Sequence, residues 1–212
     1  MNGVSPRATL VFARMSEPQR ERGDARHRGG NGSRFDMHAA ARRVLAAAGF
    51  EAQLDAPPQG QLAAIAGPAA LELGVRDLRH LPWSSIDNNE SRDLDQVEVA
   101  ELLAGDAIRL IVGIADVDVL VPKDTPLDTH AFANCTSVYT GIDVFPMLPE
   151  KLSTDFTSLN EGEDRLALAI ETVVNAGGDV VSHDVYRAMV RNTAKLTYEG
   201  VGAYLDGEAP PP

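Results

Sequence analysis

The sequence predicts a mixed α/β fold of the α+β-like kind, in which a mixed β-sheet is flanked by helices. Two observations predict it. Strand-like apolar segments alternate along the chain with helix-like segments, so neither type of element stands alone. A Gly-Gly pair at 177–178 separates two strand-like segments and predicts a hairpin, which gives the sheet an antiparallel component.

The N-terminal residues predict a tail without regular structure. Residues 17–34 are polar, rich in Arg and Gly, and nearly free of large apolar side chains. Such a segment cannot bury enough apolar surface to offset the entropy of ordering it. We therefore expect residues 1–35 to be a disordered tail. An arginine-rich tail can bind RNA, but the favoured interpretation is that Met37, which opens the first helix, is the true start of translation.

Residues 36–74 predict a helical lead-in to the sheet. Residues 37–48 are rich in alanine, follow an acidic residue and stop at a glycine, which predicts a helix. Residues 61–73 predict a second helix that is interrupted near Gly67-Pro68. The Ala-Pro-Pro segment at 56–58 is expected to be the linker between them.

Two strands are predicted in the middle of the chain. Residues 96–101 alternate between polar and apolar side chains, as in a half-buried strand. Residues 108–115 are almost continuously apolar, which predicts a central strand buried on both faces. Asp116 follows directly, at a position where a carboxylate either lines a site or caps the next turn.

The remaining segments predict a helix, a hairpin and a final helix. Their ranges are 127–138 for the helix, 165–175 and 179–190 for the strands of the hairpin, 194–205 for the last helix, and 208–212 for a proline-rich end.

An acidic segment lies between the lead-in and the first of these strands. Asp87, Glu90, Asp93 and Asp95 fall within residues 85–96. Carboxylates this close repel one another, so they stay ionised only if a metal or hydrogen-bond donors compensate. Mg²⁺ is the expected ion, because it prefers carboxylate oxygens and completes its shell with water and substrate phosphate. The alternative is a solvated acidic turn, which is disfavoured by the apolar Ile86 and the adjoining strand.

A calcium-binding loop is a further alternative. The ligand positions of an EF-hand are occupied by Asp87, Asn89, Ser91, Asp93, Asp95 and Glu98. Arg92, however, stands where the sharp turn of an EF-hand requires glycine, and a strand follows instead of a helix. Pro82 also interrupts any helix that would enter the loop.

Composition limits the compartment and the partners. The 212 residues contain one cysteine, Cys135, so an internal disulfide is excluded and a reducing compartment is indicated. The sequence shows neither an apolar run of membrane-spanning length nor the apolar core of a signal peptide. A cytoplasmic protein without a membrane partner is expected.

Charge is distributed unevenly along the chain. Seven arginines against four acidic residues give residues 1–36 a charge of +3. Since the net charge of the chain is −12, the remaining residues carry −15. A body this acidic does not bind nucleic acid through general phosphate contacts, which need Lys and Arg. Any RNA is expected to be held by local features or by protein outside this chain.

Four separated segments resemble the catalytic RNB domain of the ribonuclease II family. They are Ser-Ile-Asp at 85–87 with Asp-Leu-Asp at 93–95, Val-Gly-Ile-Ala-Asp at 112–116, Phe-Pro-Met-Leu-Pro-Glu-Lys-Leu-Ser at 145–153, and Ala-Lys-Leu-Thr-Tyr at 194–198. The resemblance runs from Asp77 to Leu205 and covers about the first half of that domain. It implies an RNB-type mixed sheet flanked by helices, with residues 75–207 as the N-terminal part of the domain.

Members of the family are hydrolytic, Mg²⁺-dependent 3′-to-5′ exoribonucleases that act on single-stranded RNA and release nucleoside 5′-monophosphates. The resemblance implies that Asp87, Asp93 and Asp95 hold the metal and act in catalysis, with Asp95 closest to the chemistry. The family's fourth active-site aspartate is replaced here by Gln96, which brings no charge to a metal.

Two tyrosines fall on further positions of the family's site. Tyr139 matches a tyrosine that clamps the nucleotide at the 3′ end, and Tyr198 matches one near the scissile phosphate. Aromatic stacking is a general way to hold single-stranded RNA. The resemblance therefore implies that both tyrosines bind RNA and that Tyr198 also takes part in catalysis.

The family's catalytic domain normally continues beyond this segment, where it supplies an arginine and a glutamate to the active site, and oligonucleotide-binding domains usually flank it. We therefore expect a truncated domain, whose partner is the missing C-terminal half. The alternative function is a catalytically inactive fragment with residual RNA or metal binding, and an EF-hand-like calcium-binding module is disfavoured. Incomplete cover of the strand at 108–115 is also expected.

Overall fold

The protein is described by a computed structural model that covers residues 35–71 and 73–212. The tail predicted for residues 1–35 therefore lies, apart from Phe35, outside the described residues. Within the described ranges, no helix is both long enough and apolar enough to span a membrane.

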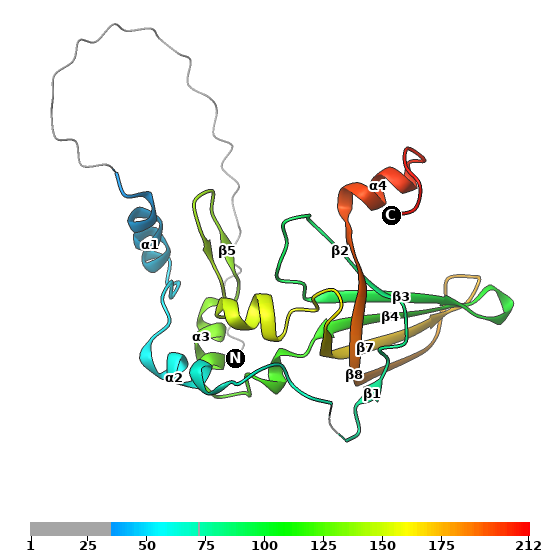
Figure 1. Ribbon diagram of the computed structural model, residues 1–212, viewed down its shortest axis with the longest axis horizontal. Helices are drawn as coiled ribbons and strands as arrows, with labels where there is room; N and C mark the ends of the chain where they lie inside the picture. Colours follow the sequence, from blue (N-terminus) through cyan, green and yellow to red (C-terminus); the bar gives the residue numbers. More distant parts are fainter. Residues whose placement is uncertain (1–34, 72) are drawn as a thin grey trace, which may run out of the picture. The chain divides into compact units, whose positions relative to one another are not determined.

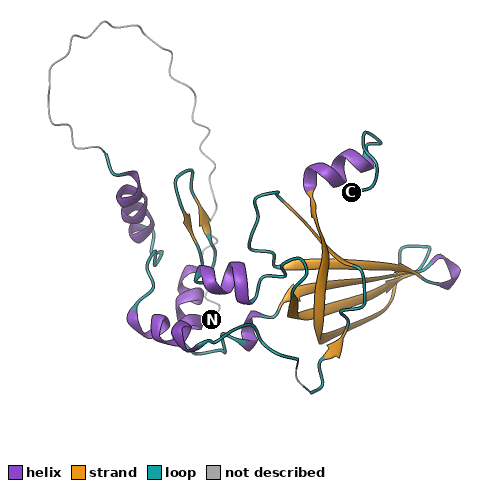
Figure 2. Ribbon diagram, in the orientation of Figure 1, coloured by secondary structure: helices purple, strands orange, loops and turns teal. Residues whose placement is uncertain are grey.

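The sheet contains six strands in the order β1-β8-β2-β3-β4-β7, and β7 also pairs with β8. The strands are β1 (Arg76–Asp77), β2 (Trp83–Asp87), β3 (Gln96–Leu102), β4 (Ile108–Ala115), β7 (Asp164–Val174) and β8 (Val180–Thr197). The pairings β8–β2–β3–β4–β7–β8 form a closed ring, as the orange ribbons in Figure 2 show. β8 is parallel to β1 and β2, whereas the other pairs are antiparallel, which confirms the predicted mixed sheet.

The length of β8 closes the ring (Figure 1). Its first part pairs with β7 as far as Arg191, and its last part pairs with β2 from Asn192 to Thr197. Thr193 is an extra residue between two consecutive pairs with β2, so the strand bulges there. The buried Asn192 amide donates hydrogen bonds to Ser85 Oγ and to the Leu159 carbonyl, both at 3.0 Å. These bonds fix the point at which β8 changes partner.

The core fills the inside of the ring around Trp83, which is fully buried and donates from Nε1 to the Leu78 carbonyl at 2.8 Å. Small residues on the facing strands make room for the indole. A Cβ at Gly113 would lie 3.1 Å from Val97 Cγ2 and 3.6 Å from the Trp83 ring. The other buried members are Leu81, Leu94, Val97, Val99, Ile111, Leu159, Ala167, Ala169, Ala188 and Val190.

β4 is central in the sheet, as predicted, but the prediction that both of its faces are buried is wrong. Ile111 and Gly113 point into the ring, whereas Ile108 and Leu110 on the outer face are 46% and 38% exposed. Successive residues of a strand face opposite sides, and in the described residues helices do not cover the outer side here. The expected incomplete cover of this strand is thus observed.

The lead-in contains α1 (Met37–Ala47) and α2 (Ala56–Ala64). α1 agrees with the prediction, and the Asp36 side chain caps it by accepting from the Ala39 amide. The second helix was predicted in the wrong place, because its prolines lie in the first turn, where a missing N–H costs no helical hydrogen bond. The chain leaves the helix at Ile65, so the predicted continuation to residue 73 is also wrong.

The other helices are α3 (Pro126–Asn134) and α4 (Tyr198–Leu205), with short turns η1 (Ala104–Asp106), η2 (Val117–Val119) and η3 (Lys151–Phe156). α3 ends earlier than predicted because Cys135 adopts a left-handed conformation with φ 58°. α4 begins at Tyr198 instead of residue 194, since the preceding residues are held in β8 by pairing with β2.

A small hairpin and a second core complete the described fold. β5 (Val138–Tyr139) and β6 (Val144–Phe145) form a separate two-stranded sheet. α2, α3 and η3 pack around buried leucines, of which Leu127 and Leu152 are fully buried. The hairpin and η3 are the elements that, together with the β2–β3 connection, surround the candidate site.

Candidate functional site

The acidic loop, defined as residues 87–95, connects the antiparallel strands β2 and β3. Asp87 ends β2, and Asp95 directly precedes β3. Strands therefore flank the loop on both sides, where an EF-hand requires helices. The EF-hand alternative is wrong for this reason.

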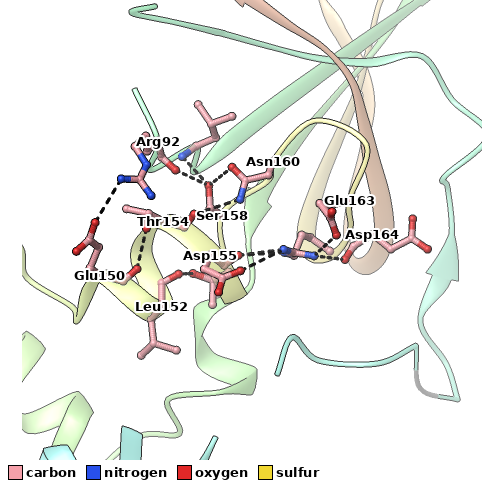
Figure 3. Close-up of polar contacts among 12 residues, drawn as sticks. Arg92, Glu150, Leu152, Thr154, Asp155, Ser158, Asn160, Glu163 and Asp164 are labelled. Carbon is pink, nitrogen blue, oxygen red and sulfur yellow. Dashed lines mark hydrogen bonds and ion pairs between the residues drawn. The ribbon is translucent and has the colours of Figure 1, made fainter. Parts of the chain in front are cut away.

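The C-terminal end of the loop is anchored in the core by Leu94, which is 2% exposed. The Leu94 amide donates to Ser158 Oγ at 3.0 Å, and the Leu94 carbonyl accepts from the Leu159 amide at 2.7 Å. Figure 3 shows Ser158 at the centre of this contact, where its hydroxyl also donates to the Arg92 carbonyl at 2.9 Å. Because Leu94 points inward, the neighbouring Asp93 and Asp95 are left on the solvent side of an extended segment.

Tyr139 on β5 lies next to Asp93, although 46 residues separate the two in the sequence. The phenol donates a hydrogen bond to Asp93 Oδ2. This bond, with partial burial and the negative charges of Asp95 and Asp87, raises the pKa of Tyr139 to about 12. The structure thus brings together Tyr139 and the three predicted aspartates.

Tyr198 is placed by strand register. Thr197 pairs with Asp87 in the β2–β8 ladder, and Tyr198 follows as the first residue of α4. Its side chain is exposed. The register therefore places Tyr198 beside the start of the acidic loop, while the tyrosine itself is not among the residues that line the neighbouring cleft.

A cleft of about 750 Å³ lies between the acidic loop, the β5–β6 hairpin and η3. It is lined by Asn88, Glu90, Ser91, Arg92, Asp93, Ser137, Tyr139, Thr140, Gly141, Ile142, Asp143, Val144, Pro146, Glu150, Ser153 and Thr154. Asp93 and Tyr139 line it, whereas Asp87 and Asp95 do not. Arg92, the one basic residue of the lining, is 3.5 Å from Glu150, so the cleft is acidic overall.

The donor chemistry of the loop fits a hydrated Mg²⁺. Among the described residues, no three Asp, Glu, His or Cys side chains converge closely enough to enclose a metal ion. Mg²⁺ does not require an enclosing cage, because it keeps several waters and is commonly held by one or two carboxylates plus substrate phosphate. Asp87, Asp93 and Asp95 provide carboxylates of this kind on one anchored loop.

Gln96, at the position where the family has a fourth aspartate, bonds within β3 instead of with this group. Its amide donates to Glu98 Oε1, two residues further along β3. Successive residues of a strand alternate between its faces, so this contact joins side chains on one face. Position 96 therefore contributes neither a charge nor a side-chain contact to the loop carboxylates.

Two residues that support the loop were missed by the sequence interpretation. Ser158 had no distinguishing pattern, since a buried serine that bonds two backbone groups is visible only in the tertiary structure. Lys195 lies in a segment predicted as a helix, so its contact with the acidic loop was not expected. In the structure its Nζ donates to the carbonyls of Asn89 and Ser91. Asp116, left open between a site and a cap, instead pairs with Arg187 at 2.8 Å.

Comparisons with known proteins agree with one another. The family model described as "RNB domain" matches residues 75–211. Ribonuclease R of Escherichia coli is 40% identical over 141 residues, which are 66% of this chain and 17% of that protein. The chain thus spans about a sixth of the length of this relative.

Solved structures show the same fold. A structure of Mycoplasma genitalium RNase R in complex with ribose methylated single-stranded RNA matches with a TM-score of 0.73 and 22% identity, over 83% of this chain and 28% of that one. Yeast Ssd1, a pseudonuclease, matches with a TM-score of 0.59 and 14% identity, over 68% of this chain and 18% of that one.

The match to the RNB domain runs from β1 to the end of α4, and therefore includes the closed sheet, the acidic loop and both tyrosines. The resemblance seen in four short segments is confirmed along this whole stretch. This chain belongs to the RNB domain family.

Proposed function

We propose that this chain carries the metal-binding part of a Mg²⁺-dependent hydrolytic exoribonuclease, which shortens single-stranded RNA from the 3′ end and releases nucleoside 5′-monophosphates. The observation that carries the proposal is the acidic loop, in which Asp93, flanked by Asp87 and Asp95, accepts a hydrogen bond from Tyr139 at an open cleft. The relatives support it, since ribonuclease R and its complexes with RNA are among the matches.

The aspartates have distinct roles in the proposal. Asp87, Asp93 and Asp95 would hold the ion, and Asp95 is the residue whose loss is most damaging. The ion held there would supply Lewis-acid chemistry, that is, polarisation of a phosphodiester oxygen, activation of water and stabilisation of the leaving oxygen. The anchoring of Leu94 keeps Asp93 and Asp95 at a fixed separation, which reduces the cost of organising the site.

The tyrosines would hold the RNA. Tyr139 is 64% exposed and lines the cleft, so its ring is accessible to a terminal base. Tyr198, beside Asp87 by register, would act near the scissile phosphate. The acidic lining of the cleft leaves the phosphates to be compensated by the cation and by protein outside this chain, for which the rest of the catalytic domain is the proposed partner. The single cysteine supports a cytoplasmic location.

The second candidate is a catalytically inactive RNB protein that retains RNA or metal binding. Two observations favour it. Gln96 bonds to Glu98 instead of joining the carboxylates, and the same fold occurs in yeast Ssd1, a pseudonuclease. Fold alone does not decide between these candidates, because function depends on the site.

The deciding experiment uses the full chain, a 5′-labelled single-stranded RNA and Mg²⁺, with products resolved by length. The proposal expects a ladder that shortens from the 3′ end, is lost in Asp95→Asn, and is lost when EDTA removes the metal. Asp106→Asn, in η1 at the far end of β3, is the matched control and keeps the ladder. Intact RNA with the wild-type chain would favour the inactive candidate, and degradation that survives in Asp95→Asn would contradict the assigned site.

A further inference from the structure

The acidic loop is held at two separate points, and only one of them is in the core. Its C-terminal end is fixed by Leu94, Ser158 and Leu159, as described above. Its middle, residues 88–90, is exposed. A separate contact is needed to hold this part, because the core anchor does not reach it.

Lys195 supplies that contact. It lies on the last part of β8, opposite Ser85 in the parallel ladder with β2, and is half-buried. Its Nζ donates to the Asn89 carbonyl at 3.0 Å and to the Ser91 carbonyl at 2.6 Å. The two carbonyls lie on either side of Glu90, so the ammonium group holds the crest of the loop to β8. The turn at this crest is closed by the Ser91 amide, which donates to the Asn88 carbonyl at 3.1 Å.

The positive charge of Lys195 gives its contact with the loop a second effect. The loop contains four carboxylates, those of Asp87, Glu90, Asp93 and Asp95, whereas its one basic residue, Arg92, is engaged with Glu150. An ammonium group at the crest offsets part of this repulsion and satisfies two carbonyls at once. The loop then does not depend on a metal ion to keep its shape.

We propose that Lys195 is a positioning residue, which holds the acidic loop in its binding conformation before a cation arrives. The proposal rests on the proposed function for the identity of the cation, but not for the ordering of the loop. Lys195 acts through the backbone of Asn89 and Ser91 and touches neither the metal nor the RNA.

Hydrogen exchange of the metal-free full chain tests the ordering directly. In the wild type, the Ser91 amide is expected to be protected because the crest is closed. Lys195→Met is expected to lose this protection, while the Leu94 amide, bonded to Ser158, stays protected as an internal reference. Lys195→Arg, which keeps the charge and two donors, is expected to restore the protection, and Lys123→Met, at an exposed lysine after η2, changes nothing. Equal exchange at Ser91 in the wild type and Lys195→Met would overturn the proposal.

Mn²⁺ titration without RNA then tests the consequence for metal binding. Loss of a residue that orients ligands commonly weakens metal affinity by about 10- to 100-fold, so Lys195→Met is expected to bind Mn²⁺ at least roughly tenfold more weakly, with Lys195→Arg close to the wild type. Equal affinity in wild type and Lys195→Met would overturn the proposal. Absence of Mn²⁺ binding by the wild type would instead overturn the proposed function, and the exchange result would still decide the role of Lys195.

Discussion

Two tyrosine–carboxylate pairs lie near opposite ends of the sheet, and their surroundings differ in charge. At the acidic loop, Tyr139 donates to Asp93 with Asp87 and Asp95 nearby. At the hairpin end, defined as Arg76, Glu101, Arg109, Glu171 and Tyr186, the Tyr186 hydroxyl donates to Glu171 at 2.6 Å. Arg109 there pairs with Glu101, and the Arg76 guanidinium lies 3.5 Å from the Tyr186 ring centre. Each arginine of the hairpin end pairs with a carboxylate, Arg109 with Glu101 and Arg76 with Asp184, whereas the acidic loop contains one arginine and four carboxylates.

The pKa values of the two tyrosines reflect this difference. Both are raised to about 12. For Tyr186 the main cause is burial, followed by Glu171, and Arg76 acts in the opposite direction. For Tyr139 the main cause is the hydrogen bond to Asp93, followed by burial and the charges of the aspartates. Paired charges stabilise a fold by themselves, while an excess of carboxylates favours the binding of a cation from outside, as expected of a binding site.

The largest expected effect comes from the core anchor of the acidic loop. Leu94→Ala removes a buried side chain and leaves a cavity, so it should lower the free energy of unfolding by about 2–5 kcal/mol. Leu102→Ala, at an exposed position near the hairpin end, should change it by less than about 0.5 kcal/mol. Urea denaturation of both variants measures this, and similar losses in the two would show that the loop is not anchored through the core.

Stabilisation by metal binding should depend on the carboxylates at only one end of the sheet. A ligand present at a hundred times its Kd raises the free energy of unfolding by about 2.7 kcal/mol, so Mg²⁺ should raise the Tm of the wild type. Asp93→Asn should reduce this rise, because it removes a proposed ligand. Glu171→Gln, which alters the equivalent carboxylate of the hairpin end, should keep it. A rise that is lost in Glu171→Gln but kept in Asp93→Asn would reverse the assignment of the site.

A smaller loss of stability is expected from the serine beneath the loop. Ser158→Ala leaves the Leu94 amide and the Arg92 carbonyl without their partner, which should cost about 1–3 kcal/mol. Ser182→Ala, at an exposed position on β8, serves as the matched control. Thermal unfolding monitored by circular dichroism separates the two, and a neutral Ser158→Ala would mean that other contacts hold this end of the loop.

The smallest effect concerns the titration of the tyrosines. Asp93→Asn should lower the pKa of Tyr139 from about 12, because the hydrogen bond to the carboxylate is its main cause. Glu171→Gln should lower the pKa of Tyr186 less, because burial remains. Ultraviolet phenolate absorbance, compared with Tyr139→Phe and Tyr186→Phe, measures both shifts, and a larger shift for Tyr186 would contradict the comparison.

These raised pKa values also set the direction of a pH effect. Unfolded tyrosine loses its proton near pH 10, whereas the folded Tyr139 and Tyr186 keep theirs to about 12. The folded state therefore binds more protons in this interval, so the stability contributed by both groups is full below pH 10 and declines toward pH 12. Unfolding measured across this range should show that decline, and Tyr139→Phe should make it shallower.

Local patterns predicted the elements whose signals are confined to neighbouring residues. The alanine-rich helix at α1, the turn around Gly177-Gly178 and the alternating strand at β3 all depend on residues a few positions apart, and the structure contains each of them. The prediction of the second helix failed because the local pattern alone does not show where a helix begins. Its prolines predict a break, whereas in the structure they occupy the first turn.

The sequence by itself determined the chemistry available to this protein: a dense group of carboxylates on a short connection, two tyrosines at matching family positions, and an acidic body. Tertiary structure alone decided how that chemistry is arranged. Tyr139 meets Asp93 across 46 residues. Lys195 meets the crest of the loop across 104 residues because β8 changes partner from β7 to β2. Residue types and spacing are encoded locally, whereas contacts between distant segments depend on the register in which the ring of strands closes.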